Sequence, residues 1–138
     1  MTFTIKTKGL DHLVLRTARW NKMTQFYINV LGCKLERTVE SLGLYQLRAG
    51  HSLIDLIDTD GELGLKGGPP PGDKGLNLDH FCLLVDPWDE MAIRLHLHHH
   101  GIIPPDVFQR YGAEGMGPSL YIDDLDGNTI ELKGPSID

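Results

Sequence analysis

One short segment of the chain occurs twice at a constant interval. Residues 11–23, DHLVLRTARWNKM, return at residues 79–91 as DHFCLLVDPWDEM. The shared offset of 68 residues aligns an Asp-His pair, a leucine, a tryptophan and a methionine. A repeat of this kind predicts that the 138 residues form two half-sized copies of one supersecondary unit, which share a core.

The ends of the two halves also correspond. Ile54-Asp55-Leu56 matches Ile130-Glu131-Leu132 at an offset of 76, so the second half holds about eight additional residues. These fit best in the glycine-rich stretch RYGAEGMGPS at 110–119. We interpret that stretch either as a lid that closes over a substrate or as an ordinary flexible connection.

Both halves show the same order of elements. A strand with the Asp-His pair precedes a helix that ends at a glycine, Gly32 or Gly101, and three shorter strands follow. The unit is therefore β-α-β-β-β, twice. We expect a first module over about 8–60, a glycine- and proline-rich linker over 61–77, and a second module over about 78–135. The expected elements are strands at 9–17, 34–41, 44–50 and 51–58 with a helix at 19–31, then strands at 78–86, 103–110, 118–125 and 128–134.

Composition excludes several classes of protein. Hydrophobic residues make up 41% and charged residues 23%, which is typical of a globular protein and argues against disorder. A net charge of -6 weighs against nucleic acid or an anionic membrane as the main partner. The chain has no apolar run that could span a bilayer, no signal-peptide pattern and no metal-type cysteine pair. We therefore expect a cytoplasmic protein with reduced thiols.

Strand alternation places polar residues on the face away from each helix. The apolar side of each first strand receives the helix, so the histidine side must face elsewhere. Each half thus offers one imidazole from its first strand and one carboxylate from its last, and an approximate two-fold would bring the four together: His12, Asp55, His80 and Glu131. Imidazole and carboxylate ligands suit Zn, Ni, Fe or Mn, and a set with open positions is typical of a catalytic metal site.

Other polar residues receive a less specific interpretation. A single histidine on a strand is usually structural, and the matched recurrence is what favours a metal role here. The histidines of LHLHHHG at 95–101 suit the C-terminal end of a helix and need no ligand role. Cys82 shares the face of His80, and it either lines the site or is a small buried residue. Asp11 and Asp79 alternate to the opposite face, so they are not counted as ligands.

Four segments resemble the vicinal oxygen chelate superfamily, which includes glyoxalase I, bleomycin-resistance proteins and extradiol dioxygenases. They are LDHLVLRT, QFYINVLGCKLER, LDHFCLLV and PSLYIDDLDGNTIELKG, and the last departs from the family ending by Leu125 where proline is usual. The resemblance covers nearly the whole chain. It implies an α+β fold of two tandem βαβββ modules, whose curved eight-stranded sheet forms a cup around a metal, commonly in a homodimer.

The resemblance also assigns roles to individual residues. It places the two histidines, Asp55 and Glu131 on the four ligand positions of the glyoxalase I pattern, with Asp55 where glutamate is usual. Arg16 corresponds to an arginine that meets the carboxylate of glutathione. Thr59 stands where asparagine is typical for glutathione, so half of that signature is missing.

Three functions follow from the resemblance. The first is a lyase or isomerase like lactoylglutathione lyase, in which the metal stabilises an enediolate and Glu131 and Asp55 move the proton. The second is an extradiol dioxygenase that binds iron through His12, His80 and Glu131, with Tyr121 over the open face. The third is a binding protein that sequesters a drug without metal. Relatives of that third kind often lack the histidine and glutamate ligands, so the residues here argue against it.

Overall fold

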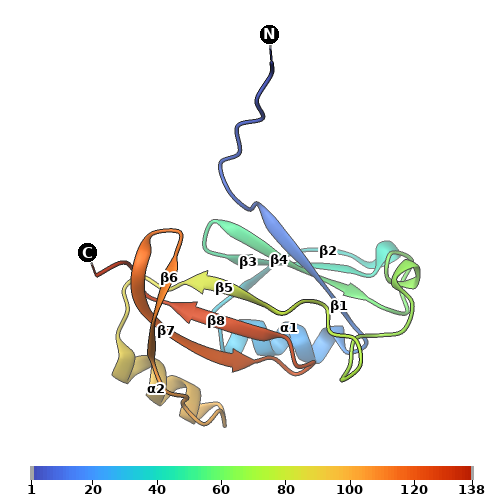
Figure 1. The fold of residues 1–138 in the computed structure, drawn as a ribbon. Coiled ribbons are helices and arrows are strands. Elements are labelled where there is room, and N and C mark those ends of the chain that lie inside the picture. The colour runs from blue at the N-terminus through green and yellow to red at the C-terminus, as the bar shows by residue number, and fades with distance from the viewer. Residues whose placement is uncertain (1, 138) are drawn as a thin grey trace. The chain divides into compact units, whose positions relative to one another are not determined.

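The computed structural model describes residues 2–137 and divides into two compact units. The first holds the chain up to Ile28 together with Gly32–Pro70, and the second holds Asn29–Leu31 and the chain from Pro71 onward. The chain forms two four-stranded sheets, each with one α-helix between its first and second strands (Figure 1). The prediction of two β-α-β-β-β modules is therefore confirmed.

The first sheet has the strand order β1-β4-β3-β2. Its first and last strands pair in parallel, and the other two pairings are antiparallel. A parallel pair needs a long crossover connection, which α1 and the β2–β3 hairpin provide. The elements are β1 (His12–Thr17), α1 (Trp20–Asn29), β2 (Lys34–Val39), β3 (Leu44–Ala49) and β4 (Ser52–Asp58).

The second sheet repeats this topology with the order β5-β8-β7-β6. Its register is also the same, because His12 lies opposite Leu53 and His80 lies opposite Thr129. The first strands of the two halves correspond at an offset of 68 and the last strands at an offset of 76, and first and last strands pair in the same register in both sheets. The elements are β5 (His80–Leu84), α2 (Glu90–His99), β6 (Phe108–Gly112), β7 (Gly115–Asp123) and β8 (Thr129–Lys133).

Alternation along the strands separates a buried apolar side from the side that carries the histidine. Ile54 and Leu56 of β4 are almost fully buried, as are Ile130 and Leu132 of β8. Complete burial of one such side chain contributes about 1.5–3 kcal/mol to folding. Both helices are followed by glycines in the left-handed region, Gly32 at φ 72° and Gly101 at φ 76°, which confirms the predicted helix stops.

Residues 61–69, predicted as part of a linker, belong to the first unit. A short 3-10 helix forms at Gly64–Gly67. The Arg16 guanidinium donates to the carbonyl oxygens of Gly64, Gly68 and Pro69 at 3.0, 2.7 and 3.1 Å. A side-chain carbon on Gly67 would lie 2.2 Å from the guanidinium carbon, so this approach requires glycine. We call residues 61–69 the strap.

The glycine-rich stretch at 110–119, interpreted from the sequence as a lid or as a flexible connection, belongs to the β6–β7 hairpin. Ser119 of β7 pairs with Lys133, and Leu44 of β3 pairs with the equivalent residue of the first sheet, Ile57. Strand β3 begins at Leu44, whereas β7 begins four residues before Ser119. The additional residues of the second half therefore extend β7, and β6 pairs with the extension. The expected strands at 103–110 and 118–125 are correspondingly shifted.

Close packing explains the glycines of this hairpin. A side-chain carbon on Gly117 would lie 2.7–2.9 Å from the carbonyl oxygens of Pro135 and Gly134 and from Lys133 Nζ. Contacts that short do not occur, so residue 117 must be glycine.

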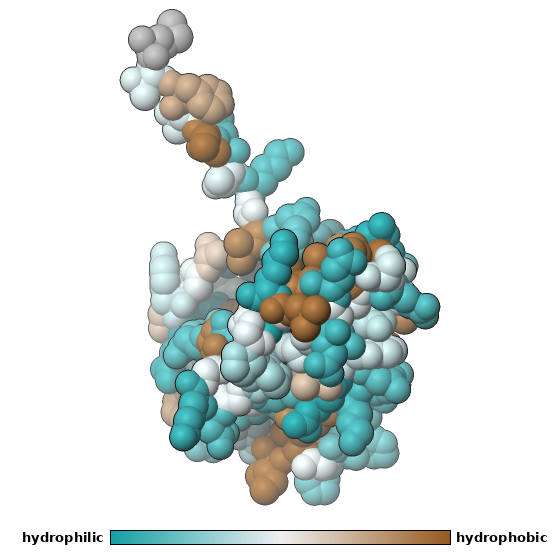
Figure 2. All heavy atoms as spheres, turned by 90° about the vertical axis from the view of Figure 1, so that its right-hand side faces the viewer, coloured by the Kyte–Doolittle hydropathy of each residue, from teal (hydrophilic) through white to brown (hydrophobic). Residues whose placement is uncertain are grey.

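The face in Figure 2 carries mostly polar side chains, and apolar side chains lie on the segment that precedes β1. Phe3 and Ile5 in that segment are 87% and 78% exposed. Among the described residues, no helix has the length and apolar character needed to cross a membrane.

We predict that Gly67→Ala lowers the free energy of unfolding by about 1–3 kcal/mol, because the new methyl displaces the guanidinium from three carbonyl oxygens. Gly72→Ala is the matched control, since its new methyl meets no atom within 4 Å. Urea denaturation of both variants measures the difference. Equal stability of the two variants would show that the strap does not depend on Arg16.

Candidate metal centre

The second unit brings one histidine and one carboxylate together. In the parallel ladder, His80 lies opposite Thr129 and Cys82 lies opposite Glu131, so the four side chains share one face. His80 Nε2 lies 3.4 Å from Glu131 Oε1. Glu131 is only 7% exposed, and its other oxygen accepts a 2.7 Å hydrogen bond from the Ser119 hydroxyl. One carboxylate oxygen is thus fixed and the other faces the imidazole.

The distance between His80 and Glu131 fits a shared cation. A neutral imidazole Nε2 without hydrogen and a carboxylate oxygen both present lone pairs. They face one another favourably only with a proton or a cation between them. Two ligand atoms bound at about 2.1 Å to a tetrahedral zinc ion lie about 3.4 Å apart. The donor set of this unit therefore fits half of a metal site.

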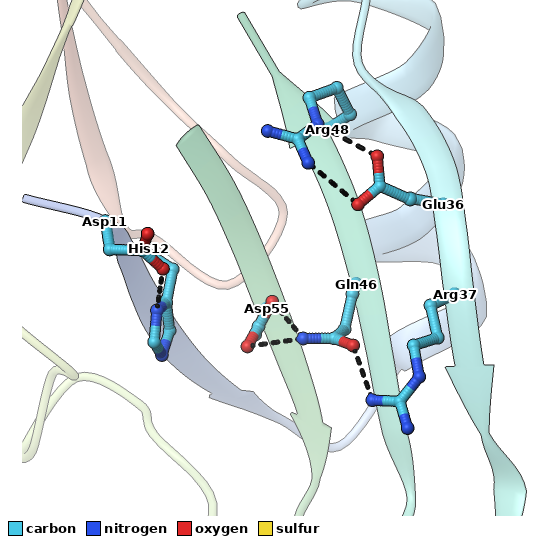
Figure 3. A network of polar contacts seen from close by, with 7 residues as sticks. All are labelled: Asp11, His12, Glu36, Arg37, Gln46, Arg48 and Asp55. Carbon is cyan, nitrogen blue, oxygen red and sulfur yellow. Dashed lines mark hydrogen bonds and ion pairs between the residues drawn. The ribbon is translucent and has the colours of Figure 1, made fainter. Parts of the chain in front are cut away.

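The first unit holds the matching pair. Val14 lies opposite Asp55 and His12 lies opposite Leu53, so His12 and Asp55 share one face of the sheet. Asp55 is 4% exposed, and its carboxylate accepts from the Gln46 amide at 3.3 and 3.2 Å. Arg37 in turn donates to the Gln46 carbonyl oxygen at 3.0 Å (Figure 3). This chain of contacts ties Asp55 to β3.

Charges near β1 affect the ionisation of His12. The pKa of His12 is raised, first by its hydrogen bond to Asp11, against the opposing effect of desolvation. The charges of Asp55 and Asp11 raise this pKa further. At the far side of the network, Arg48 makes a two-pronged contact with Glu36 at 2.9 and 2.8 Å and lowers the pKa of that carboxyl (Figure 3).

Asp11 and Asp79 contact the candidate ligands, which the sequence interpretation missed. His12 Nδ1 lies 2.8 Å from Asp11 Oδ2, and His80 Nδ1 lies 2.6 Å from Asp79 Oδ2. Alternation points the Cβ atoms of neighbouring residues to opposite faces, but the carboxylates turn back to the rings. The recurrence of the Asp-His pair in both halves was the sequence feature that could have indicated these contacts.

Two further predicted residues lie beside Glu131. Cys82 is its neighbour on β5 and Tyr121 its neighbour on β7. The Tyr121 ring meets His80 edge to face at a centroid distance of 6.0 Å, and its hydroxyl accepts from Arg110 Nε at 3.3 Å. Desolvation and, after it, the charge of Glu131 raise the pKa of the Cys82 thiol to about 11.

Arg16 is placed differently from the other predicted residues. Its alternation puts it on the face of His12 and Val14, yet its guanidinium reaches the strap carbonyls. Its role in substrate binding therefore stays a prediction.

The predicted ligands thus form two half-sites, His12 with Asp55 and His80 with Glu131. Across residues 2–137, no group of three or more histidine, cysteine, aspartate or glutamate side chains could hold a metal ion. The four-ligand set stays a prediction, whereas the pairing within each unit follows from the strand registers.

Comparison with known proteins identifies the family. The family model of the Glyoxalase/Bleomycin resistance protein/Dioxygenase superfamily matches residues 9–132. The chain belongs to this superfamily. The resemblance seen in the sequence is confirmed, and so is the fold class, as two four-stranded sheets of the βαβββ type.

Two curated relatives of this superfamily member are each 31% identical to it. One is the glyoxalase domain-containing protein RDO1 of Mycosarcoma maydis, matched over 131 residues, 93% of this chain and 69% of the relative. The other is biphenyl-2,3-diol 1,2-dioxygenase 3 of Rhodococcus globerulus, matched over 135 residues, 92% of this chain and 63% of the relative. The chain thus spans about two thirds of the length of these relatives.

Solved structures share the fold over nearly the whole chain. A protein from the mobile metagenome of V. Pseudocholerae is 30% identical, with a TM-score of 0.78 over 97% of this chain and 99% of the other. Lactoylglutathione lyase from Agrobacterium tumefaciens is 17% identical, with a TM-score of 0.65 over 94% and 95% of the two chains. At that identity the second comparison shows the fold alone.

We predict that Ser119→Ala destabilises the protein by about 1–3 kcal/mol, because it leaves a buried carboxylate oxygen of Glu131 without its donor. Thr129→Ala is the control, since it removes an exposed 2.8 Å hydrogen bond to Asp123 and should change stability by less than about 0.5 kcal/mol. Urea unfolding compares the two. A smaller loss for Ser119→Ala than for Thr129→Ala would contradict the buried contact.

Proposed function

We propose that this chain is a divalent-metal-dependent lyase or isomerase of the glyoxalase type. Its substrate would be a small molecule with two neighbouring oxygens, such as the hemithioacetal of a 2-oxoaldehyde and a thiol. The 3.4 Å approach of His80 Nε2 to Glu131 Oε1 is the observation that carries the proposal. Family membership and the matching pair of His12 and Asp55 support it.

The residues that would hold the metal are His12, Asp55, His80 and Glu131. Imidazole nitrogen and carboxylate oxygen suit Zn, Ni, Fe or Mn. When bound, such a cation acts as a Lewis acid and stabilises negative charge on substrate oxygens.

The two carboxylates are suited to different tasks. Ser119 occupies Glu131 Oε2, so Oε1 is the atom that faces the histidine and can accept a substrate proton. Asp55 has a shorter side chain, and the Gln46 amide contacts both of its oxygens. We therefore assign the general base to Glu131 and an anchoring role to Asp55.

Substrate contacts would come from the strands on either side of Glu131. Cys82 and Tyr121 flank it on the same face of the sheet, and Arg110 at the Tyr121 hydroxyl adds a positive charge. Arg16 would reach a substrate carboxylate only by giving up the strap carbonyls. Because the Arg16 guanidinium is already hydrogen-bonded to the strap, a substrate other than a glutathione adduct is favoured.

A second candidate is an extradiol-type dioxygenase. The relative named biphenyl-2,3-diol 1,2-dioxygenase 3 is 31% identical to this chain. If Gln46 keeps Asp55 away from the metal, the ligands left are two histidines and Glu131, a set that suits iron with open positions. Tyr121, edge-on to His80, would then lie beside the open positions.

Metal binding and activity test both candidates. After removal of metal with EDTA, the protein should bind Zn²⁺ or Ni²⁺ stoichiometrically, and His12→Ala or His80→Ala should weaken binding at least tenfold. His96→Ala is the control, because that residue lies on α2 with its ring at the Val30 carbonyl oxygen, 2.8 Å away. Titration calorimetry provides the measurement. A wild-type protein without bound metal, or a double histidine variant that retains it, would overturn the metal site.

Catalysis separates the two reactions. Glu131→Gln should lower turnover of a methylglyoxal hemithioacetal by roughly 10²–10⁴-fold if Glu131 is the base. The adducts of glutathione and of a smaller, uncharged thiol should be compared. Cleavage of a catechol with oxygen, and no turnover of either adduct, would favour the dioxygenase.

A further inference from the structure

We propose that Asp11 and Asp79 are positioning residues that fix the tautomer of the two candidate metal-binding histidines. The proposal rests on the proposed function, because it concerns how the histidines are prepared for a metal. Its physical basis is the direct contact of each aspartate with Nδ1 of the adjacent ring, which at His80 leaves Nε2 as the nitrogen that faces Glu131.

The hydrogen bonds define which nitrogen carries the proton. Asp11 Oδ2 lies 2.8 Å from His12 Nδ1 and Asp79 Oδ2 lies 2.6 Å from His80 Nδ1. An ionised carboxylate has no hydrogen to donate, so in both pairs Nδ1 must be the donor. A neutral ring with hydrogen on Nδ1 leaves Nε2 bare, and a bare nitrogen is the only form that can bind a metal.

The bare nitrogen is directed to the candidate metal centre. His80 Nε2 is the atom that lies 3.4 Å from Glu131 Oε1. The ring therefore lies between two carboxylates, with Asp79 at Nδ1 and Glu131 at Nε2, and only a proton or a cation at Nε2 makes the second approach favourable. A carboxylate behind a metal-binding histidine orients the ring and increases its basicity as a ligand.

The position of each aspartate in the fold makes the contact possible. His12 and His80 are the first residues of β1 and β5, so Asp11 and Asp79 stand just outside the strands. At that position the aspartate side chain can turn back to the ring of the histidine that follows it. Both aspartate side chains are at least 90% exposed, so the contacts add little to folding stability. Because an aspartate recurs at the equivalent position of each unit, we infer that its role is to position the neighbouring histidine.

The first test reads the tautomer directly in metal-free protein. Two-bond ¹H–¹⁵N correlation spectra of histidine-labelled protein at about pH 9 distinguish Nδ1–H from Nε2–H rings, since ordinary imidazoles are neutral there. We expect the Nδ1–H form for His12 and His80. Asp79→Leu should remove this preference at His80 alone, and Asp79→Asn should preserve it, because the amide oxygen still accepts. His98, which follows a leucine, is the internal reference.

The second test measures metal affinity in the same variants. Asp11→Leu and Asp79→Leu should each weaken Zn²⁺ binding roughly 10–100-fold, and Asp79→Asn should recover most of the loss. Asp73→Leu, at an acidic residue that follows a glycine and precedes a lysine, is the charge-matched control and should leave the affinity unchanged.

The outcomes separate this inference from the proposed function. An unchanged His80 tautomer in Asp79→Leu, or an unchanged affinity despite a changed tautomer, overturns the positioning role. If wild-type protein shows the expected tautomers but binds no metal, the proposed function fails and the ring contacts stand.

Discussion

The parallel pairing of the first and last strands determines the chemistry of each unit. A helix and a hairpin separate β1 from β4 and β5 from β8 in the sequence, yet each pair is adjacent in its sheet. Parallel neighbours in register place side chains on one face within reach of each other. An imidazole from one end of each half and a carboxylate from the other therefore share one face of the sheet, and in the second unit they lie 3.4 Å apart. A shift of one residue in either register would turn Glu131 or Asp55 to the opposite face.

The two half-sites use this common geometry differently. In the second unit, a hydroxyl holds one oxygen of a glutamate and leaves the other beside a histidine. In the first unit, an amide and then an arginine hold a shorter aspartate against the neighbouring strand. A base must exchange a proton and move slightly as it does so, whereas an anchor must stay in place. Under the proposed function, the longer Glu131, whose Oε1 faces the imidazole, would meet the first requirement, and Asp55 would meet the second.

Much of the architecture was accessible from the sequence because it depends on local patterns. The Asp-His repeat, the glycines after the helices and the alternation around Asp55 and Glu131 each reflect one element at a time. The role of the strap was not accessible, because it depends on contacts between Arg16 and carbonyl oxygens 48 to 53 residues away. Backbone carbonyl oxygens are present at every residue, so no sequence pattern marks the ones that an arginine will find.

The hairpin at 110–119 and the aspartates beside the histidines were misjudged for related reasons. Glycines usually indicate loops, but Gly117 is glycine because backbone oxygens and Lys133 Nζ pass too close for a side chain. Alternation predicts where Cβ points and is silent on where a flexible carboxylate ends. In both cases the deciding contact is with a group outside the local pattern. For Asp79 that group is the adjacent ring, so a polar residue next to a candidate ligand should be weighed as its hydrogen-bond partner before its own face of the strand is considered.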